Sequence, residues 1–153
     1  MRKLIILMCL VVCGIFSGCG KASYEDTLLL GHQWGEKEED FYSEIRDNYR
    51  VVEGGELFGY LVSDIDARFG ETKGLCKMGY NITLANEEDV DALIANMFEL
   101  LADAEVLQHT TDKKIEFVEW NTHNGPAGVT LKKSKEGSLW NIEIWCWYDI
   151  YYS

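Results

Sequence analysis

Positively charged residues are scarce in this chain. Its 153 residues include 14 Lys and Arg against 26 Asp and Glu, which gives a formal net charge of −12. Proteins that bind nucleic acid, or that lie flat on anionic lipid, do so through clusters of Lys and Arg. We therefore expect no nucleic-acid partner. The acidic charge remains compatible with a basic protein partner, with cations, or with solubility alone.

The sequence also lacks the short motifs of common catalytic and metal sites. It has no glycine-rich phosphate loop, no G-x-S-x-G and no H-E-x-x-H. The histidines are too scattered for the paired spacing of zinc ligands: His32, His109 and His123. Asp64-Ile65-Asp66 begins like a calcium loop, but Arg68 and Phe69 follow where an oxygen ligand and a glycine are needed. We expect no cofactor and no metal, identify no catalytic residue from a motif, and favour a non-enzymatic protein over an enzyme.

No apolar run is long enough for a transmembrane helix, which needs about 20 apolar residues. The longest run, residues 4–16, follows Arg2 and Lys3 and is itself followed by small residues. A basic start, a short apolar segment and a small-residue cleavage site are typical of a secretory signal peptide. The pattern predicts that residues 1–18 are a signal peptide.

The end of this segment, Phe16-Ser17-Gly18-Cys19, resembles the lipobox of bacterial lipoproteins. The resemblance implies cleavage before Cys19 and attachment of lipid, with acyl chains such as palmitate, to that residue. Two or more acyl chains form a stable membrane anchor, whereas one gives only marginal binding. The protein would then be lipid-anchored and extracytoplasmic, on the cell membrane or the outer membrane. An ordinary secreted protein and an uncleaved membrane anchor remain as alternatives.

Few cysteines remain once the signal peptide is removed and Cys19 is lipidated. Only Cys76 and Cys146 are left, and an even pair in an exported protein is compatible with a disulfide. Both residues fall on the apolar side of predicted strands, so buried free thiols are the main alternative. A functional thiol is the third interpretation, and no local motif supports it.

The rest of the chain predicts a tether over residues 19–35 and a single α+β domain over residues 36–153. Apolar residues at every fourth position predict a helix over 36–50, and a similar stripe favours a helix over 56–69. The alternative for the second segment is a hairpin that pairs 49–53 with 56–62 across two glycines. Strict alternation predicts a strand over 76–84, and Asn86 is the expected N-cap of a helix that follows it.

Three further strands are expected at 114–120, 127–133 and 138–148, joined by short turns into an antiparallel meander. The expected fold is therefore α+β, with two or three helices packed on one mainly antiparallel sheet of about four strands. In the last strand Trp140 and Cys146 would face the helices, and Trp145 and Trp147 would face the other way.

The outward-facing aromatic residues are the candidate binding face: Trp145, Trp147, Trp120 and Tyr151. Exposed aromatic patches mark surfaces that bind proteins, and flat indoles also suit sugar rings. A covering segment that makes these indoles part of the core is the alternative. The favoured function is an envelope lipoprotein that binds a protein or glycan through this face.

Two other functions remain open. The net charge suggests an acidic inhibitor or immunity-type lipoprotein that neutralises a basic envelope-active protein. A hydrolase of envelope material would instead need a pair of carboxyl groups, one of them in an apolar setting. Glu143 and Glu119, which lie among aromatic residues, are the candidates for that pair.

Overall fold

The computed structural model describes residues 23–42, 44–46, 49–51, 55–112, 114–122 and 127–148. The expected signal peptide, Cys19, His123 and Tyr151 lie outside these ranges. Among the helices that the structure describes, none combines the length and apolar character needed to cross a membrane. Lipid attachment at Cys19 therefore stays a prediction.

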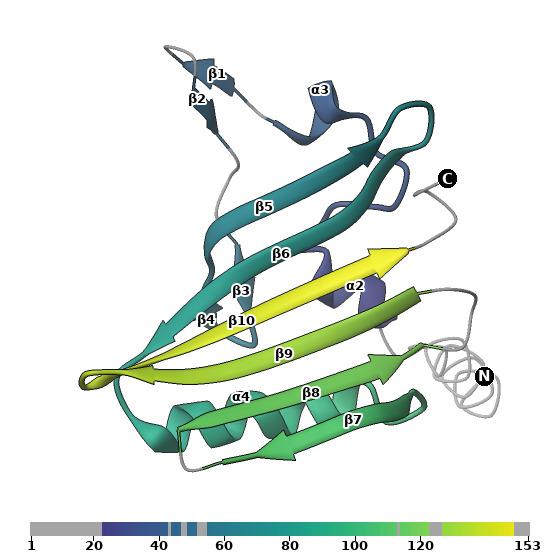
Figure 1. The fold of residues 1–153 in the computed structure, drawn as a ribbon. Helices are drawn as coiled ribbons and strands as arrows, with labels where there is room; N and C mark the ends of the chain where they lie inside the picture. Colours follow the sequence, from purple (N-terminus) through teal and green to yellow (C-terminus); the bar gives the residue numbers. More distant parts are fainter. Residues whose placement is uncertain are drawn as a thin grey trace, which may run out of the picture.

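The centre of the molecule is a six-stranded antiparallel sheet with the strand order β5-β6-β10-β9-β8-β7 (Figure 1). Its strands are β5 (Ser63–Gly70), β6 (Gly74–Leu84), β7 (Glu105–Thr111), β8 (Ile115–Asn121), β9 (Ala127–Glu136) and β10 (Leu139–Tyr148). The α+β class and the antiparallel sheet are confirmed. The expected number of about four strands is wrong, because β5 and β7 extend the sheet at its two edges.

One face of the sheet is buried, and the alternation of buried and partly exposed side chains in β10 identifies that face. Trp140, Ile142, Ile144 and Cys146 are each at most 3% exposed and lie opposite buried residues of β6. Burying an apolar side chain of this size stabilises the fold by about 1.5–3 kcal/mol. A register shift of one residue would turn all four outward, so the apolar side of β10 fixes its pairing with β6.

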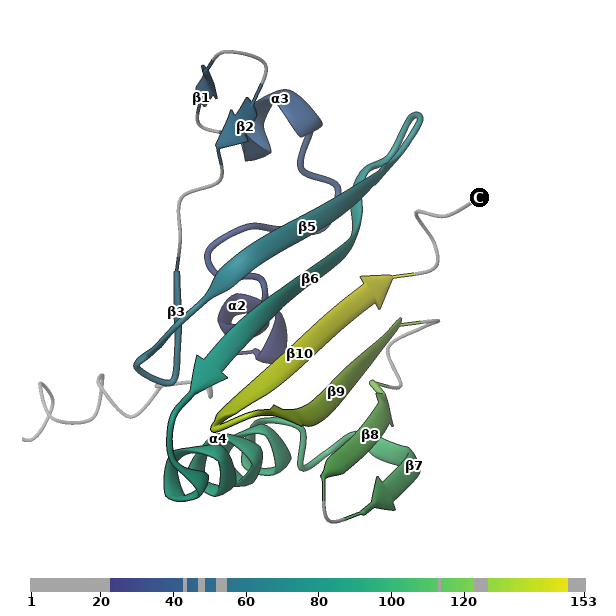
Figure 2. The same cartoon turned by 60° about the vertical axis from the view of Figure 1, so that its left-hand side comes forward.

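One long helix, α4 (Glu87–Leu100), connects β6 to β7 and packs across the buried face (Figures 1 and 2). The expected cap is confirmed, since the Asn86 side chain accepts a hydrogen bond of 2.8 Å from the backbone N–H of Asp89. The apolar residues of α4 recur at helical spacing and are buried: Val90, Leu93, Ile94 and Met97.

The chain ahead of the sheet contributes to the same core. Helix α2 (Tyr24–Leu28) lies behind the sheet in Figure 1, on the same side as α4. Leu28 and Leu29 are 0% and 2% exposed, and the Tyr80 hydroxyl donates a hydrogen bond of 3.0 Å to the Leu28 carbonyl. Residues that the sequence assigned to the tether are therefore docked on the domain.

The expected helix over 36–50 is wrong. In the described part of this segment only Glu38–Phe41 (α3) is helical, and it ends at Tyr42, whose backbone is extended. Strands β1 (Glu44–Arg46) and β2 (Tyr49–Val51) follow and pair with each other. The Phe41 ring packs against the rings of three residues outside the helix, His32, Tyr42 and Phe69. This aromatic cluster, and not a continuous helical stripe, buries Phe41.

The expected helix over 56–69 is also wrong. Strands β3 (Glu56–Leu57) and β4 (Tyr60–Leu61) form a small hairpin, and β5 then pairs with β6. Phe58 and Gly59 form the turn with φ values of 54° and 85°, which no right-handed helix contains. The alternative hairpin is wrong too, because 56–57 pairs with 60–61 and not with the segment before the glycines.

The other expected strands are confirmed as β6, β8, β9 and β10, within a few residues at each end. Strand β7 was not expected. All seven of its residues are exposed, including the apolar Val106 and Leu107. An exposed edge strand has no alternation of buried and exposed positions, so hydrophobic periodicity could not predict it.

Candidate functional site

Helices α2 and α4 cover one side of the sheet. In Figures 1 and 2 no described helix or strand covers the opposite side. Cross-strand partners project to the same side of a sheet, so the register of β10 identifies the residues on this side. We call it the open face, and its central residues are Asp66, Arg68, Lys77, Gly79, Gly128, Glu143, Trp145 and Trp147.

Trp145 lies flat on the sheet over Gly79, its cross-strand partner on β6. A Cβ atom built on Gly79 would run into three atoms of the indole, Cδ2, Cε3 and Cε2, all at similar distances. The missing side chain of Gly79 is therefore replaced by the face of the ring. The indole Nε1 donates a hydrogen bond of 2.7 Å to Oε1 of Glu143, which fixes the orientation of the ring.

Trp147 has the same arrangement on the other side of β10. Its cross-strand partner on β9 is Gly128, and a Cβ atom on Gly128 would meet Cζ2, Cε2 and Cη2 of the indole. Aromatic side chains that cover cross-strand glycines stabilise sheets of this kind. Both indoles are half-buried, with one face against the backbone. The structure thus places these two expected residues together on the open face.

Two cations border the indoles. Arg68, Lys77 and Trp147 are successive cross-strand partners on β5, β6 and β10. The Lys77 Nζ atom lies 4.6 Å from the centre of the Trp145 ring, which is within the range of a cation–π interaction. Within the described ranges, no ion pair joins Arg68 or Lys77 to a carboxylate. An acidic side chain is nevertheless close, because Asp66 is the cross-strand partner of Gly79 and lies two residues before Arg68 on the same face.

Trp120 does not belong to this face, so that expectation is wrong. It is 1% exposed, pairs with the buried Val129 and packs edge-on against Phe98 of α4 at 5.2 Å. In β8 the residues that point inward are Glu116, Val118 and Trp120. The fourth expected residue, Tyr151, lies outside the described residues.

The two cysteines are free and buried in the structure. Cys146 lies opposite Met78, two residues from Cys76, and the Cys76 thiol donates to the carbonyl oxygen of Arg68 at 3.2 Å. Burial raises the pKa of Cys146 to about 12 and also raises the pKa of Cys76. Thiols of this kind are poor nucleophiles, because the reactive thiolate is scarcely populated. The arrangement fits the alternative of buried free thiols.

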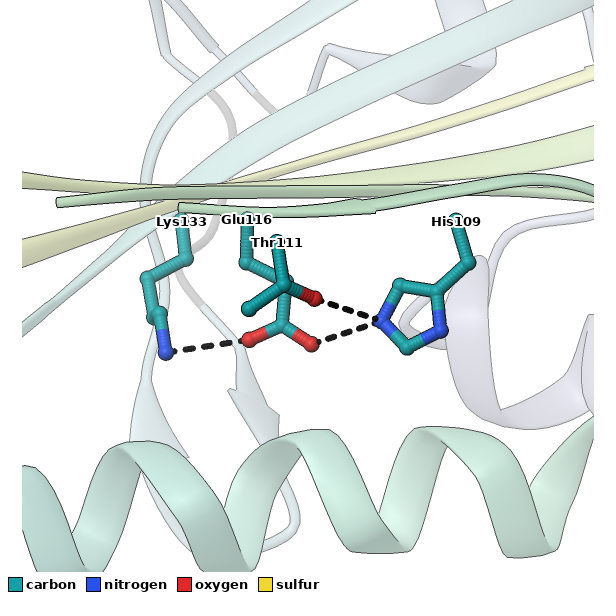
Figure 3. A network of polar contacts seen from close by, with 4 residues as sticks. All are labelled: His109, Thr111, Glu116 and Lys133. Atoms are coloured by element: carbon teal, nitrogen blue, oxygen red, sulfur yellow. Dashed lines mark hydrogen bonds and ion pairs between the residues drawn. The ribbon is translucent and has the colours of Figure 1, made fainter. Parts of the chain in front are cut away.

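A second polar cluster lies between the sheet and α4 (Figure 3). Oε1 of Glu116 is 2.9 Å from His109 Nε2, Oε2 is 3.0 Å from Lys133 Nζ, and the Thr111 hydroxyl is 3.4 Å from the same histidine nitrogen. Burial alone would raise the pKa of Glu116, but hydrogen bonds from His109 and Lys133 and the charge of Lys133 outweigh it and lower that pKa from 4.5. Both carboxylate oxygens are occupied, so we interpret the cluster as a connection between β7, β8 and β9.

The sequence did not predict this cluster, because the strand that carries His109, β7, was not expected. The position of His109 on β7 explains how it reaches Glu116. The remaining described histidine, His32, contacts Glu36 at 2.9 Å and stacks on Phe41. Across the described residues, no group of three or more His, Cys, Asp or Glu side chains is arranged to hold a metal ion.

The carboxyl groups considered for hydrolysis do not face each other as a pair. Glu143 lies on β10 and accepts the hydrogen bond from Trp145, whereas Glu119 lies on β8, with β9 between the two strands. In the register of the sheet Glu143 aligns with Lys132, while Glu119 aligns with Thr130. The two residues therefore differ in both strand and row.

Comparison with known proteins found no match. No family model, no curated protein and no solved structure matches this chain. The geometry of the open face is thus the basis for a functional proposal.

Proposed function

We propose that this protein is a lipid-anchored, non-enzymatic envelope lipoprotein that binds a partner through the open face. The observation that carries the proposal is the pair of indoles held flat over Gly79 and Gly128, on a side of the sheet without a covering described element. Aromatic residues dominate the binding energy of many interfaces, because rigid rings offer a large contact area at a low cost in conformational entropy.

The anchor and the open face are compatible with one role. A lipid on Cys19 would hold the domain at the outer surface of a membrane, and the open face would then meet protein or glycan in the envelope. The buried faces of the indoles fix both rings in advance, so a partner loses little affinity in ordering them. Among the described residues, Cys76 and Cys146 are buried thiols and Glu143 does not face Glu119, so catalysis through these groups has no comparable support.

Affinity capture from the native envelope tests the proposal. The bait is the full-length lipoprotein purified in detergent, beside a Trp145→Ala/Trp147→Ala variant whose fold is checked by circular dichroism. We expect the native bait to retain a partner that the folded double variant binds at least tenfold more weakly, which is typical of the loss of interface anchors. Leu61→Ala is a matched control, because Leu61 is an apolar residue 76% exposed on β4, away from the open face.

The acidic inhibitor remains the second candidate, supported by a separate surface. The first turn of α4 is acidic, with Glu87, Glu88 and Asp89. The Tyr60 hydroxyl donates a hydrogen bond of 3.2 Å to Asp89 and brings β4 beside that turn. A partner that the tryptophan variant still retains, and that raised ionic strength releases, would favour this surface and contradict the open face.

A further inference from the structure

The centre of the open face is flat. The rings of Trp145 and Trp147 lie along the sheet over Gly79 and Gly128, so both indoles stay close to the backbone. Sites for small ligands are concave, whereas the flat faces of two sheets can pack against each other. The shape therefore favours a second flat surface as the partner.

The extent of the open face fits a protein–protein interface. Six strands about 4.8 Å apart span roughly 24 Å. Along β10 the four outward positions from Asn141 to Trp147 define four rows of cross-strand partners, which together span roughly 20 Å. With the relief of its side chains, a patch of roughly 24 by 20 Å provides accessible area of the order of the 800 Å² that each partner buries in a standard interface.

The charges on these four rows are nearly balanced, although those of the whole chain are not. The register assigns four acidic and three basic residues to the rows: Asp66, Glu105, Glu119 and Glu143 against Arg68, Lys77 and Lys132. Without residues 1–18 the chain has 26 acidic and 12 basic residues. Two copies of so acidic a chain repel each other in general, and the repulsion is much weaker where these rows meet.

Two neighbouring rows carry opposite charges on the same strand. The row of Trp145 contains Asp66 on β5, and the row of Trp147 contains Arg68 on the same strand. A two-fold axis that runs across the strands between these rows would place each row opposite the other row of a second copy. Asp66 of one copy would then face Arg68 of the second, and the reverse pair would form at the same time, since a two-fold interface is isologous.

The same axis gives both indoles a partner. Trp145 leans over β6 and would face Lys77 of the second copy, whose ammonium suits the face of an indole. Trp147 leans over β9 and would face Thr130 of the second copy, a side chain of modest size. The pattern of the face is thus complementary to itself.

We propose that the open face binds a second copy of this chain, in a symmetric dimer whose two sheets pack face to face with Asp66 opposite Arg68. This inference rests on the proposed function and names its partner. The indoles are ordered before the copies meet, which lowers the entropic cost of association. The two symmetric ion pairs fix the alignment of the sheets, because opposed charges specify register at an interface.

An exchange of the two charges tests this arrangement. Sedimentation equilibrium of the full-length protein, with detergent micelles in large excess, measures the dissociation constant of the dimer. Asp66→Arg or Arg68→Asp alone places like charges opposite each other at two symmetric positions, and we expect each to weaken the dimer at least about tenfold. The combined variant Asp66→Arg/Arg68→Asp restores opposite charges, and we expect a dissociation constant within about threefold of the native one.

Asp91→Arg is the matched control, because it makes the same change of charge as Asp66→Arg at an exposed position on α4, away from the open face. We expect it to leave the dimer intact. Circular dichroism checks the fold of each variant. A native protein that stays monomeric would overturn the inference, and so would a dimer that neither single substitution weakens. A combined variant as weak as the single ones would contradict the facing of Asp66 and Arg68.

The capture experiment distinguishes this inference from the function on which it rests. A tagged bait that retains untagged copies of the same chain through Trp145 and Trp147 supports the dimer. A different protein or a glycan retained through these indoles, together with a monomeric native protein, would refute the dimer and keep the open face as a binding surface. The absence of both a dimer and any partner held through the indoles would refute both.

Discussion

At the scale of single residues, the open face depends on two glycines as much as on two tryptophans. The indoles lie flat only because Gly79 and Gly128 lack side chains. Glycine in a strand normally weakens the sheet, and here the aromatic ring supplies the missing contacts. The alternation of β10 was enough to predict the positions of Trp145 and Trp147 from the sequence. The glycines opposite them could not be recognised, since their role depends on the register.

Gly79→Ala tests this pairing. The new methyl group would meet the Trp145 ring, which the hydrogen bond to Glu143 holds in place. Overpacking of this kind typically costs about 1–3 kcal/mol in the free energy of unfolding. In a Trp145→Ala background we expect Gly79→Ala to be nearly neutral, because no ring is present to collide with it. Urea denaturation of the four members of this cycle measures the coupling, and additive effects would contradict the stacked geometry.

At the scale of elements, the sequence predicted those whose periodicity matches a half-buried environment. The strands β6, β8, β9 and β10 alternate, and α4 has a cap and a continuous apolar stripe. The segments at 36–50 and 56–69 show a helical spacing that tertiary contacts override. Leu61, for example, belongs to the apparent stripe of the second segment but is 76% exposed, while Leu57 is fully buried. Spacing alone does not distinguish these two environments.

The contacts of Glu116 connect β7, β8 and β9, and they predict that the free energy of unfolding depends on pH. The pKa of this carboxyl is lowered in the folded state, so its stabilising effect is present above the unfolded pKa of about 4.5 and is lost as pH falls through the folded pKa. We expect Glu116→Gln to lower the free energy of unfolding at neutral pH by on the order of 1 kcal/mol. The difference between variant and native protein should shrink once pH is below both pKa values.

Denaturation curves at a series of pH values measure this difference. Glu119→Gln is the matched control, because it alters a half-buried glutamate of the same strand on the other face of the sheet. A difference between Glu116→Gln and the native protein that stays constant with pH would show that the carboxylate charge does not contribute. An equal pH dependence of Glu119→Gln would assign the effect to the general charge of the sheet.

At the scale of the whole molecule, the distribution of charged residues bears on how the protein could be held at a membrane. Without residues 1–18 the chain has 12 basic and 26 acidic residues, a net charge of −14. Acids gather at the start of α3 and α4, and on the open face Asp66 and Glu143 lie near Arg68 and Lys77. A strongly acidic domain is repelled by anionic lipid, so attraction to the membrane surface would not hold it there. Under the proposed function, retention at a membrane would depend on a lipid attached to Cys19.

Cys19→Ala therefore decides where the protein resides. We expect the native protein in the membrane fraction, labelled by radioactive palmitate, and the variant to lose the label and processing at residue 18. Cys13→Ala is a close control, since Cys13 lies within the apolar run and would be removed with the signal peptide. It should keep both the label and the membrane location. A Cys19→Ala protein that is still labelled and processed would contradict the lipobox, and native protein recovered unlabelled from the medium would identify an ordinary secreted domain.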